Sequence, residues 1–215
     1  MSRSARRVRR TTEEARQLIL GTAQALIART GPEGLRLQDI AAAAGISHPL
    51  ILHHFKNRAG LIRALTREAA AELRDRLVAA MNQPEYSPAE QLDRVFEAFR
   101  GGLAQRLAWL AVVDPAGGEA DSAMILREIA DTLQARRFAT APPGNEVTRE
   151  DTECLIHLVA IAAFGEAMYG RQLRRSAGID AGEKAVRRFR DWFAALIRVH
   201  GQGHVECAPR EDDPA

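Results

Sequence analysis

The chain has 215 residues, 46% of them hydrophobic, and its 30 Lys and Arg residues nearly balance its 28 Asp and Glu residues. This composition is ordinary for a soluble chain with a sizeable core, and the length allows one or two domains. The two cysteines, Cys154 and Cys207, exclude a disulfide framework, and no apolar run approaches the roughly 18 residues of a membrane span.

Charge is distributed unevenly along the chain. Residues 1–75 hold 13 Lys and Arg against 7 Asp and Glu, whereas residues 76–215 hold 17 against 21. The first ten residues carry five arginines, namely Arg3, Arg6, Arg7, Arg9 and Arg10. A basic front end on a mildly acidic body indicates an acidic partner, although a solubilising arm without specific contacts would have the same composition.

The segment "RRVRR" followed by the apolar stretch "LILGTAQALIA" has the outline of a signal peptide. Charged and polar residues at positions 13–17 separate the two parts, and the apolar stretch is amphipathic rather than uniform. We therefore predict a helix here and a cytoplasmic protein. Thr11 and Glu14 have the spacing of a capping box at its start, and Gly31 is a plausible end.

The rest of the chain predicts helix after helix, because no segment shows sustained two-residue alternation with β-branched enrichment. Breaks occur at "NQPEYSP", Gly101-Gly102, "DPAGG", "TAPPGN" and "GIDAG". The expected fold class is all-α, with about nine helices. Their expected ranges are about 11–30, 37–44, 47–55, 58–82, 88–101, 103–112, 119–138, 148–176 and 182–199.

The segment from residue 36 to residue 58 has the pattern of a helix-turn-helix. Ala41 is the small residue that lets the second helix cross the first closely, and Gly45 tolerates the positive φ that the turn needs. Ser47 is a good N-cap for the second helix, and Pro49 lies in its first turn. Three apolar residues are expected to plug the angle between the helices, namely Ile40, Ile46 and Ile51.

This segment resembles the N-terminal domain of the TetR family of transcriptional regulators. The family pattern is approximately I-A-x-x-A-G-V-S-x-G-x-L-Y-x-Y-F-x-S-K-x-x-L. Counting conservative replacements, the matching residues are Ile40, Ala41, Ala44, Gly45, Ile46, Ser47, Ile51, His54, Phe55, Asn57, Arg58 and Leu61. The lead-in fits Gly31, Gly34 and Leu35, and the resemblance covers about residues 11–65.

Three positions depart from the family pattern. Arg36 stands where a Ser or Thr usually caps the first helix of the motif, and it can reach a phosphate instead. Pro49 stands where Gly is frequent. Leu52 replaces a Tyr whose hydroxyl bonds a phosphate, so His53 or Lys56 is expected to replace that contact.

The resemblance implies that the second helix of the motif enters the major groove of DNA. The residues expected at base edges are Gln38, His48, Pro49 and Leu50, although each could be an ordinary exposed position. The residues expected at phosphates are Arg6, Arg7, Arg9, Arg10, Arg36, Ser47, His53, His54, Lys56 and Arg58.

Metal binding is a weaker interpretation of the histidines. His53 and His54 are neighbours on a helix, where side chains diverge by about 100°, and His54 could lie half-buried beside Phe55. The tail places His200, His204 and Cys207 at loosely metal-like spacing in a glycine-broken segment. We expect no metal and no cofactor.

The resemblance also implies a helical regulatory domain that binds a small molecule and dimerises through its last two helices. Two apolar stripes fit such pairing, although any one residue could belong to the core of a single chain. The interface candidates are Leu155, Leu158, Ala162, Gly165, Tyr169, Val186, Phe189, Trp192, Phe193 and Leu196.

The effector pocket has no motif that can be transferred from the family. Apolar side chains that could line it, each more often core than ligand contact, are joined by Cys154 and His157 as polar candidates. The pocket candidates are Phe96, Phe99, Trp109, Met124, Phe138, Cys154, His157, Ile161, Phe164 and Met168.

The resulting prediction is a homodimeric repressor, not an enzyme, that binds a palindromic DNA operator, has no membrane partner and is released by a largely apolar small molecule. The expected organisation is a basic arm at 1–10, a DNA-binding domain at 11–71, a regulatory domain at 72–204 and a polar tail at 205–215. Alternatives are an activator of the same fold, a helical-bundle enzyme using Asp151, Glu153, Cys154 or His157, and a non-specific architectural DNA binder.

Overall fold

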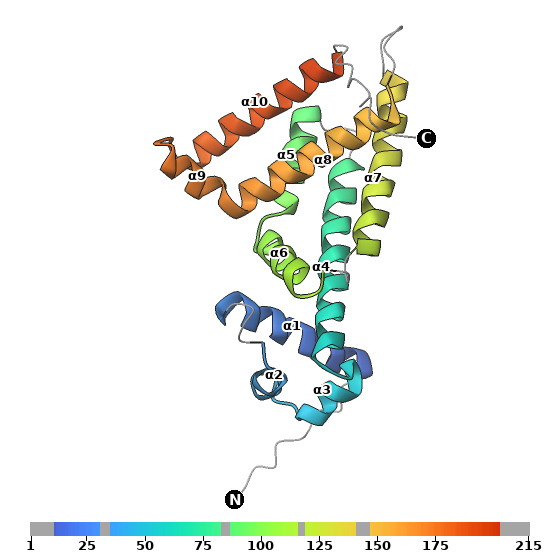
Figure 1. Cartoon of the computed structure of the whole chain (residues 1–215), viewed down its shortest axis with the longest axis vertical. Coiled ribbons are helices and arrows are strands. Elements are labelled where there is room, and N and C mark those ends of the chain that lie inside the picture. The colour runs from blue at the N-terminus through green and yellow to red at the C-terminus, as the bar shows by residue number, and fades with distance from the viewer. Residues whose placement is uncertain (1–10, 31–34, 83–86, 116–118, 141–146, 203–215) are drawn as a thin grey trace, which may run out of the picture. The chain divides into compact units, whose positions relative to one another are not determined.

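A computed structural model describes residues 11–30, 35–82, 87–115, 119–140 and 147–202, and its regular elements in these ranges are all helical (Figure 1). The all-α prediction is confirmed. Helices α8 and α9 are continuous through a π-helical turn, η2, so the described residues form nine unbroken helical segments, the number that the breaks in the sequence predict.

The described chain divides into two compact units. Unit 1 contains the residues up to Ala70 together with Arg106–Glu119, and unit 2 contains Ala71–Gln105 and the residues from Ala120 onward. Helices α4 and α6 each contribute residues to both units.

Unit 1 is built around the predicted helix-turn-helix. Its helices are α1 Thr12–Thr30, α2 Leu37–Ala44, α3 His48–Phe55, the first part of α4 Arg58–Met81 and most of α6 Leu103–Val113. The predicted capping box begins α1: the Thr11 N–H donates to Glu14 Oε2 at 2.7 Å, and the Glu14 N–H donates to Thr11 Oγ1 at 3.2 Å.

The core of unit 1 is formed by apolar residues from each of its first four helices. Ile19 from α1, Ile40 from α2, Ile51 from α3 and Leu61 from α4 are fully buried. Ala41 is buried as well, as the close crossing of α2 requires.

The junction between α3 and α4 is tight. Lys56 has a positive φ of 68°, which is unusual for a residue with a side chain. Asn57 Oδ1 accepts the N–H of Gly60 at 2.8 Å, which is N-cap chemistry at the start of α4. A Cβ at Gly60 would lie 2.0 Å from the backbone oxygen of Phe55, so only glycine fits there.

Unit 2 contains the remaining helices, including the second part of α4 and the start of α6. They are α5 Pro88–Ala98, α7 Glu119–Thr140, α8 Arg149–Gly165, η2 Glu166–Gly170, α9 Arg171–Ser176 and α10 Glu183–Gln202. The link at residues 82–88 ends in a capping box, in which the Glu90 N–H donates to Ser87 Oγ and the Ser87 N–H to Glu90 Oε2.

Helix α10 packs on α5 through aromatic rings and a buried arginine. The edges of Phe189 and Phe193 meet Phe96 at 6.1 and 6.0 Å between centroids. Arg190 lies 5.2 Å from the centre of the Phe96 ring and pairs with Asp93 and Glu97 of α5. This contact joins segments that are about a hundred positions apart in the sequence.

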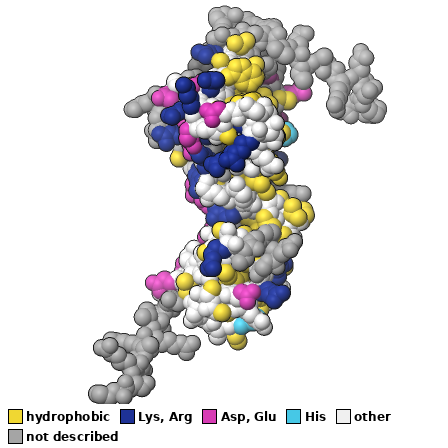
Figure 2. All heavy atoms as spheres, turned by 90° about the vertical axis from the view of Figure 1, so that its left-hand side faces the viewer, with side chains coloured by type: hydrophobic (Ala, Val, Ile, Leu, Met, Phe, Trp, Pro, Cys, Tyr) yellow, Lys and Arg dark blue, Asp and Glu magenta, His cyan; other side chains and the backbone are white. Residues whose placement is uncertain are grey.

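The surface of unit 2 combines charge with exposed apolar residues. On the face shown in Figure 2, Lys and Arg side chains gather beside Asp and Glu side chains. The segment Arg149–Ser176 is long and apolar enough, by length and composition, to cross a membrane, although the sequence alone predicts no span; 11% of its apolar window is buried. A helix of a soluble protein that pairs with another chain passes the same test, so the finding is weak evidence for a membrane.

Candidate nucleic-acid interface

The turn between α2 and α3 fixes the direction of the outward helix. Gly45 has φ 63° and ψ 35°, in the left-handed region that the sequence predicts for it. Its N–H donates to the Ala42 carbonyl at 3.3 Å, and the Ile46 N–H donates to the Ala41 carbonyl at 3.0 Å. These two bonds form a Schellman motif, which ends α2 and redirects the chain into α3 within three residues.

Helix α3 has one buried face and one exposed face. Ile51 and Phe55, four positions apart, are buried in the core of unit 1. Because successive side chains are rotated by about 100°, Pro49 and His53 lie on the opposite side, and both are exposed. The exposed face of α3 is therefore available to a partner along its whole length.

The base-edge candidates are all exposed or partly exposed in the first turns of α2 and α3. Pro49 is exposed on α3, and His48 and Leu50 are partly exposed in the same first turn. Gln38 is exposed in the first turn of α2. Ser47 occupies the N-cap position of α3, as the sequence predicts. Its hydroxyl forms no capping hydrogen bond with any described residue, although a good N-cap is expected to accept one.

The phosphate candidates in the described residues lie around the same helix. Arg36, at the N-cap position of α2, His53 and Lys56 are all exposed, and Arg36 makes no capping bond among the described residues. Arg58 is exposed and donates its Nε–H to the Leu35 carbonyl at 3.2 Å, which ties the guanidinium to the chain before α2. Asp39 is the one acidic residue in the sequence from 36 to 58, so this surface is basic.

The two adjacent histidines have different surroundings. His53 is exposed, whereas His54 is half-buried with its ring 6.2 Å from that of Phe55. Burial lowers the pKa of His54 below its ordinary value of 6.5, and the neighbouring His53 and Arg16 lower it further. His54 is thus disfavoured as a cation, which weakens it as a phosphate contact relative to His53.

Leu52 adds an exposed apolar side chain that sequence reasoning did not assign to the interface. Its exposed fraction is 38%, and it lies one residue before His53. The resemblance identified Leu52 only as a lost phosphate contact. The helical period with Ile51 and Phe55 as the buried pair could have placed it beside Pro49 and His53.

Several predicted residues lie outside the described part of the chain. They are the arm residues Arg6, Arg7, Arg9 and Arg10 and the tail residues His204 and Cys207. His200 lies in α10, and its side chain is likewise not described. Within the described residues, no group of three His, Cys, Asp or Glu side chains could hold a metal ion.

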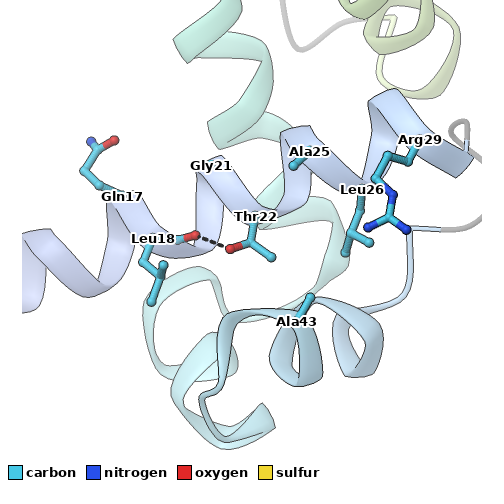
Figure 3. Close-up of a pocket in the computed structure, with 8 residues that line it drawn as sticks. All are labelled: Gln17, Leu18, Gly21, Thr22, Ala25, Leu26, Arg29 and Ala43. Atoms are coloured by element: carbon cyan, nitrogen blue, oxygen red, sulfur yellow. Dashed lines mark hydrogen bonds between the residues drawn. The ribbon is translucent and has the colours of Figure 1, made fainter.

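A shallow hollow of about 400 Å³ lies between α1 and α2 (Figure 3). Small and aliphatic side chains form most of it, with Ala25 and Leu26 on α1 and Ala43 on α2, and Arg29 is its charged member. Thr22 also lines it, and its hydroxyl donates to the Leu18 carbonyl at 2.7 Å. The hydroxyl of Thr22 therefore has its hydrogen-bond partner within α1 itself.

Comparison with known proteins agrees with this geometry. The family profile described as "Bacterial regulatory proteins, tetR family" matches residues 19–65, which include α2, α3 and the start of α4. The chain carries a TetR-family DNA-binding domain at these residues. It is therefore a DNA-binding transcriptional regulator with a helix-turn-helix, and the family is one of regulators rather than enzymes.

Relatives extend the likeness to different lengths. The chain is 27% identical over 196 residues to the HTH-type transcriptional regulator BetI of Rhizobium meliloti, covering 87% of this chain and 92% of that protein. A BetI of Escherichia coli is 34% identical over 104 residues, and the match spans 45% of this chain and about half, 51%, of that relative.

Solved structures share the fold. The multidrug binding protein EbrR, in a structure described as complexed with imidazole, has a TM-score of 0.56 at 19% identity, with 82% of this chain and 92% of that chain covered. A TetR-family regulator from Streptomyces coelicolor has a TM-score of 0.61 at 24% identity, with 88% and 83% covered.

The pocket candidates of this TetR-family chain do not gather in one place. Phe96, Phe99 and Met168 line one cavity in unit 2, and Phe164 meets Phe99 at 6.1 Å between ring centres. Trp109 lies in unit 1, beside a small cavity with Leu65 and Leu110. The other pocket candidates are exposed on the surface of unit 2, namely Met124, Phe138, Cys154, His157 and Ile161.

The dimer candidates of the family resemblance fall into three groups by exposure. Val186 and Phe193 are buried inside unit 2, and Phe189 stacks on Phe193 at 6.0 Å. The exposed members are Leu158, Tyr169, Trp192 and Leu196. The remaining members, all partly exposed on α8, are Leu155, Ala162 and Gly165.

Sequence reasoning missed the charged residues around the unit 2 cavity. Arg100, Arg171, Arg174 and Arg190 line it together with Glu166 and Glu183. They come from segments between 100 and 190 and share no short motif, so no signal in the sequence brings them together.

Proposed function

We propose that this TetR-family protein is a homodimeric repressor that binds a palindromic operator and is released by a small-molecule effector. The observation that carries the proposal is the exposed basic face of α3, with Pro49 and His53 outward while Ile51 and Phe55 anchor the helix in the core. A short helix held in this way can insert its first turns into a major groove.

The proposed dimer uses the exposed apolar stripes of α8 and α10. On α10, Trp192, Leu196 and Val199 are exposed at helical spacing, and on α8 Leu158 and Ile161 are exposed. Exposed apolar residues in such number mark an interaction surface more often than plain solvent contact. A twofold pairing would bury them, and two symmetric reading helices would then require a palindromic operator.

The proposed effector response rests on unit 2. EbrR, which shares the fold, is by its description a multidrug binding protein in complex with imidazole. Helix α4 contributes residues to both units, so a ligand that shifts unit 2 has a continuous helix through which to act on unit 1. We expect a coupling of about 1–3 kcal/mol between effector and operator. An activator is equally compatible with the fold. As a DNA-binding regulator the protein would act in the cytoplasm.

DNA selection tests the operator prediction. Duplexes selected from a random pool by the full chain should converge on one palindrome, whereas uniform binding across the pool would favour the architectural alternative. Lys56→Ala should weaken binding to every duplex and reduce the slope of log affinity against log salt by about 1. Lys184→Ala, an exposed lysine of α10, is the matched control and should leave both unchanged.

A second substitution tests base contact. Leu50→Ala should relax the preference for one base pair, because its side chain would lose contact with a thymine methyl. Leu126→Ala, at an exposed leucine of α7, is the control. If neither Lys56→Ala nor Leu50→Ala changes binding to any duplex, α3 does not dock as proposed.

Sedimentation tests the dimer. Leu196→Glu should shift the chain from dimer to monomer and move the emission of Trp192, which a dimer would bury, to longer wavelength. Val112→Glu places the same charge at a more exposed apolar position of unit 1, 79% against 46% for Leu196, and should remain dimeric. A promoter reporter distinguishes repressor from activator, since deletion of the regulator raises transcription only in the first case.

A further inference from the structure

Unit 2 contains a cavity of about 230 Å³ that combines arginines with an apolar floor. The turn between α5 and α6 forms one side, η2 and the start of α9 form another, and the first turns of α10 close the third. Phe96, Phe99 and Val186, all buried, form the apolar floor. A volume of this size suits a ligand smaller than a typical drug.

The charged lining of the cavity has an excess of positive charge. Four arginines line it against two glutamates. Glu166 is paired with Arg174 at 2.7 Å, and Glu183 with Arg100 at 3.3 Å. Both carboxylates are thus neutralised, and Arg190 is paired with Asp93 and Glu97 outside the lining, so Arg171 supplies the positive charge that no described carboxylate offsets.

Arg171 and Arg190, the other two arginines of the lining, differ in their surroundings. Arg171 is exposed and forms no ion pair with any residue that the structure describes. Arg190 pairs with Asp93 and Glu97 on the side of α5, and its side chain is only 8% exposed. Its buried Nε has no hydrogen-bond partner among the described residues, as is also true of Arg174 Nε. Unsatisfied buried donors on charged groups are rare, because they cost free energy unless an acceptor reaches them.

Backbone dipoles reinforce the positive potential. Gly101, Gly102 and Gln105 line the cavity where α6 begins, so the N-terminal end of that helix opens toward it. The opposing carbonyls at the end of α5 are already occupied, since Arg76 donates to Ala98 O at 2.9 Å and to Arg100 O at 3.0 Å. The cavity therefore adjoins the positive end of α6, while the hydrogen bonds from Arg76 offset the negative end of α5.

The π-helical turn contributes to the same wall. Glu166 and Met168 of η2 line the cavity, and Gln105 donates to the Ala167 carbonyl at 3.4 Å. A Cβ at Gly170 would lie 2.2 Å from Glu166 Oε2, so glycine there leaves room for the Glu166–Arg174 pair. π-turns within helices occur frequently at functional sites, and this one holds the arginine wall in register.

We propose that this cavity binds a small organic carboxylate with a short apolar body, and that this class of ligand is the effector. Arg171 and Arg174 would hold the carboxylate, and Phe96 and Phe99 would pack against the apolar body. Guanidinium groups bind carboxylates and phosphates alike, and the apolar floor favours an organic carboxylate over inorganic phosphate. The role of this ligand as the effector rests on the proposed function, whereas the binding of a carboxylate in the cavity does not.

Calorimetry on the full chain without DNA tests the site, with benzoate as the probe. Benzamide, the neutral analogue of the same shape, should bind at least about tenfold more weakly. Arg171→Gln should weaken benzoate by about tenfold or more, because that arginine has no ion pair to lose. Arg175→Gln is the matched control, since Arg175 is exposed on the same helix and does not line the cavity.

Three outcomes would overturn the site. They are equal binding of benzoate and benzamide, equal effects of Arg171→Gln and Arg175→Gln, and binding of inorganic phosphate as tight as that of benzoate. Val186→Phe, which would fill the apolar floor, should abolish benzoate binding, and retained near-UV circular dichroism would show that the variant still folds.

Operator binding measured with and without benzoate then tests the effector role. A drop in DNA affinity that Arg171→Gln abolishes supports it. Benzoate binding with unchanged operator affinity overturns the effector role and leaves the site. Failure to bind any operator would instead overturn the proposed function, and the two failures are therefore distinguishable.

Discussion

The reading helix of unit 1 and the cavity of unit 2 are assembled over very different distances in the sequence. The sixteen residues from Gly45 to Gly60 contain the turn, the buried pair of α3 and the start of α4. The cavity instead joins the turn after α5 to η2 and α10, about 65 to 90 positions away. A DNA-reading surface needs only a rigid local frame, whereas a small-ligand site needs walls on several sides. This difference predicts that unit 1 is most sensitive at its local junction and unit 2 at its long-range ion pairs.

The largest expected effect lies at the α3–α4 junction. Gly60→Ala should destabilise unit 1 by about 3 kcal/mol, because the new methyl group would meet the Phe55 backbone oxygen, which cannot move without shifting α3. Urea unfolding of the Trp192→Phe background, in which Trp109 of unit 1 is the remaining tryptophan, measures this loss.

Gly21→Ala is the control for that change. Nothing lies within 4 Å of a Cβ at Gly21, in the middle of α1, so this variant should gain up to about 1 kcal/mol from helix propensity. Equal losses at both positions would show that the junction is not specially constrained.

The second effect tests the long-range packing of unit 2. Arg190→Ala should cost about 2 kcal/mol, because Asp93 and Glu97 would lose their partner and Phe96 its covering guanidinium. Trp192 in a Trp109→Phe background reports on this unit, and Arg188→Ala, at an exposed neighbour on α10, should change little.

Acid should reduce the same contribution. Burial raises the pKa of Glu97, but hydrogen bonds from Arg100 and Arg190 outweigh it and leave the pKa lowered below 4.5. A carboxyl whose pKa is lower in the folded protein than in the unfolded chain contributes its full stability at pH values above the unfolded pKa. This contribution is lost as pH falls through the folded pKa. Arg190→Ala should flatten the decline in stability below pH 4.5; an unchanged acid slope would contradict the pairing.

A smaller effect is expected from the cap of α4. Asn57→Ala should destabilise unit 1 by about 1 kcal/mol, since the Gly60 N–H would lose its acceptor. Asn57→Asp keeps an acceptor at the helix start and should retain stability, as measured by the unfolding midpoint. If both variants lose the same amount, the cap is not what fixes the junction.

The smallest effect is the pH response of unit 1 near neutrality. The pKa of His54 is lowered in the fold by burial and by neighbouring positive charge, so the unfolded chain binds the proton more readily. Stability from this residue is therefore full above pH 6.5 and declines as pH falls through the lowered folded pKa. His54→Gln should flatten the profile of unfolding free energy against pH in this window, and an unchanged profile would contradict the effect of its burial.

The sequence by itself determined the helical fold and the helix-turn-helix with its exposed α3 face. The helix boundaries of the motif, the left-handed Gly45 and the capping box at Thr11 all follow from interactions between residues within five positions of one another. Side-chain period and cap chemistry are local properties, so they can be read from spacing alone. Because Ile51 and Phe55, four positions apart, mark the buried face of α3, the helical period also predicts that Leu52 is exposed.

Only the tertiary structure decided which residues of unit 2 share a site. Phe96, Phe99 and Met168 were candidates for their apolar character, but it is packing that separates them from Trp109 and Phe138. The arginine wall depends on a turn at Gly101, a π-turn at η2 and the rotation of α10 about its axis. None of these is fixed by neighbours in the sequence, because each is set by how distant helices pack against one another.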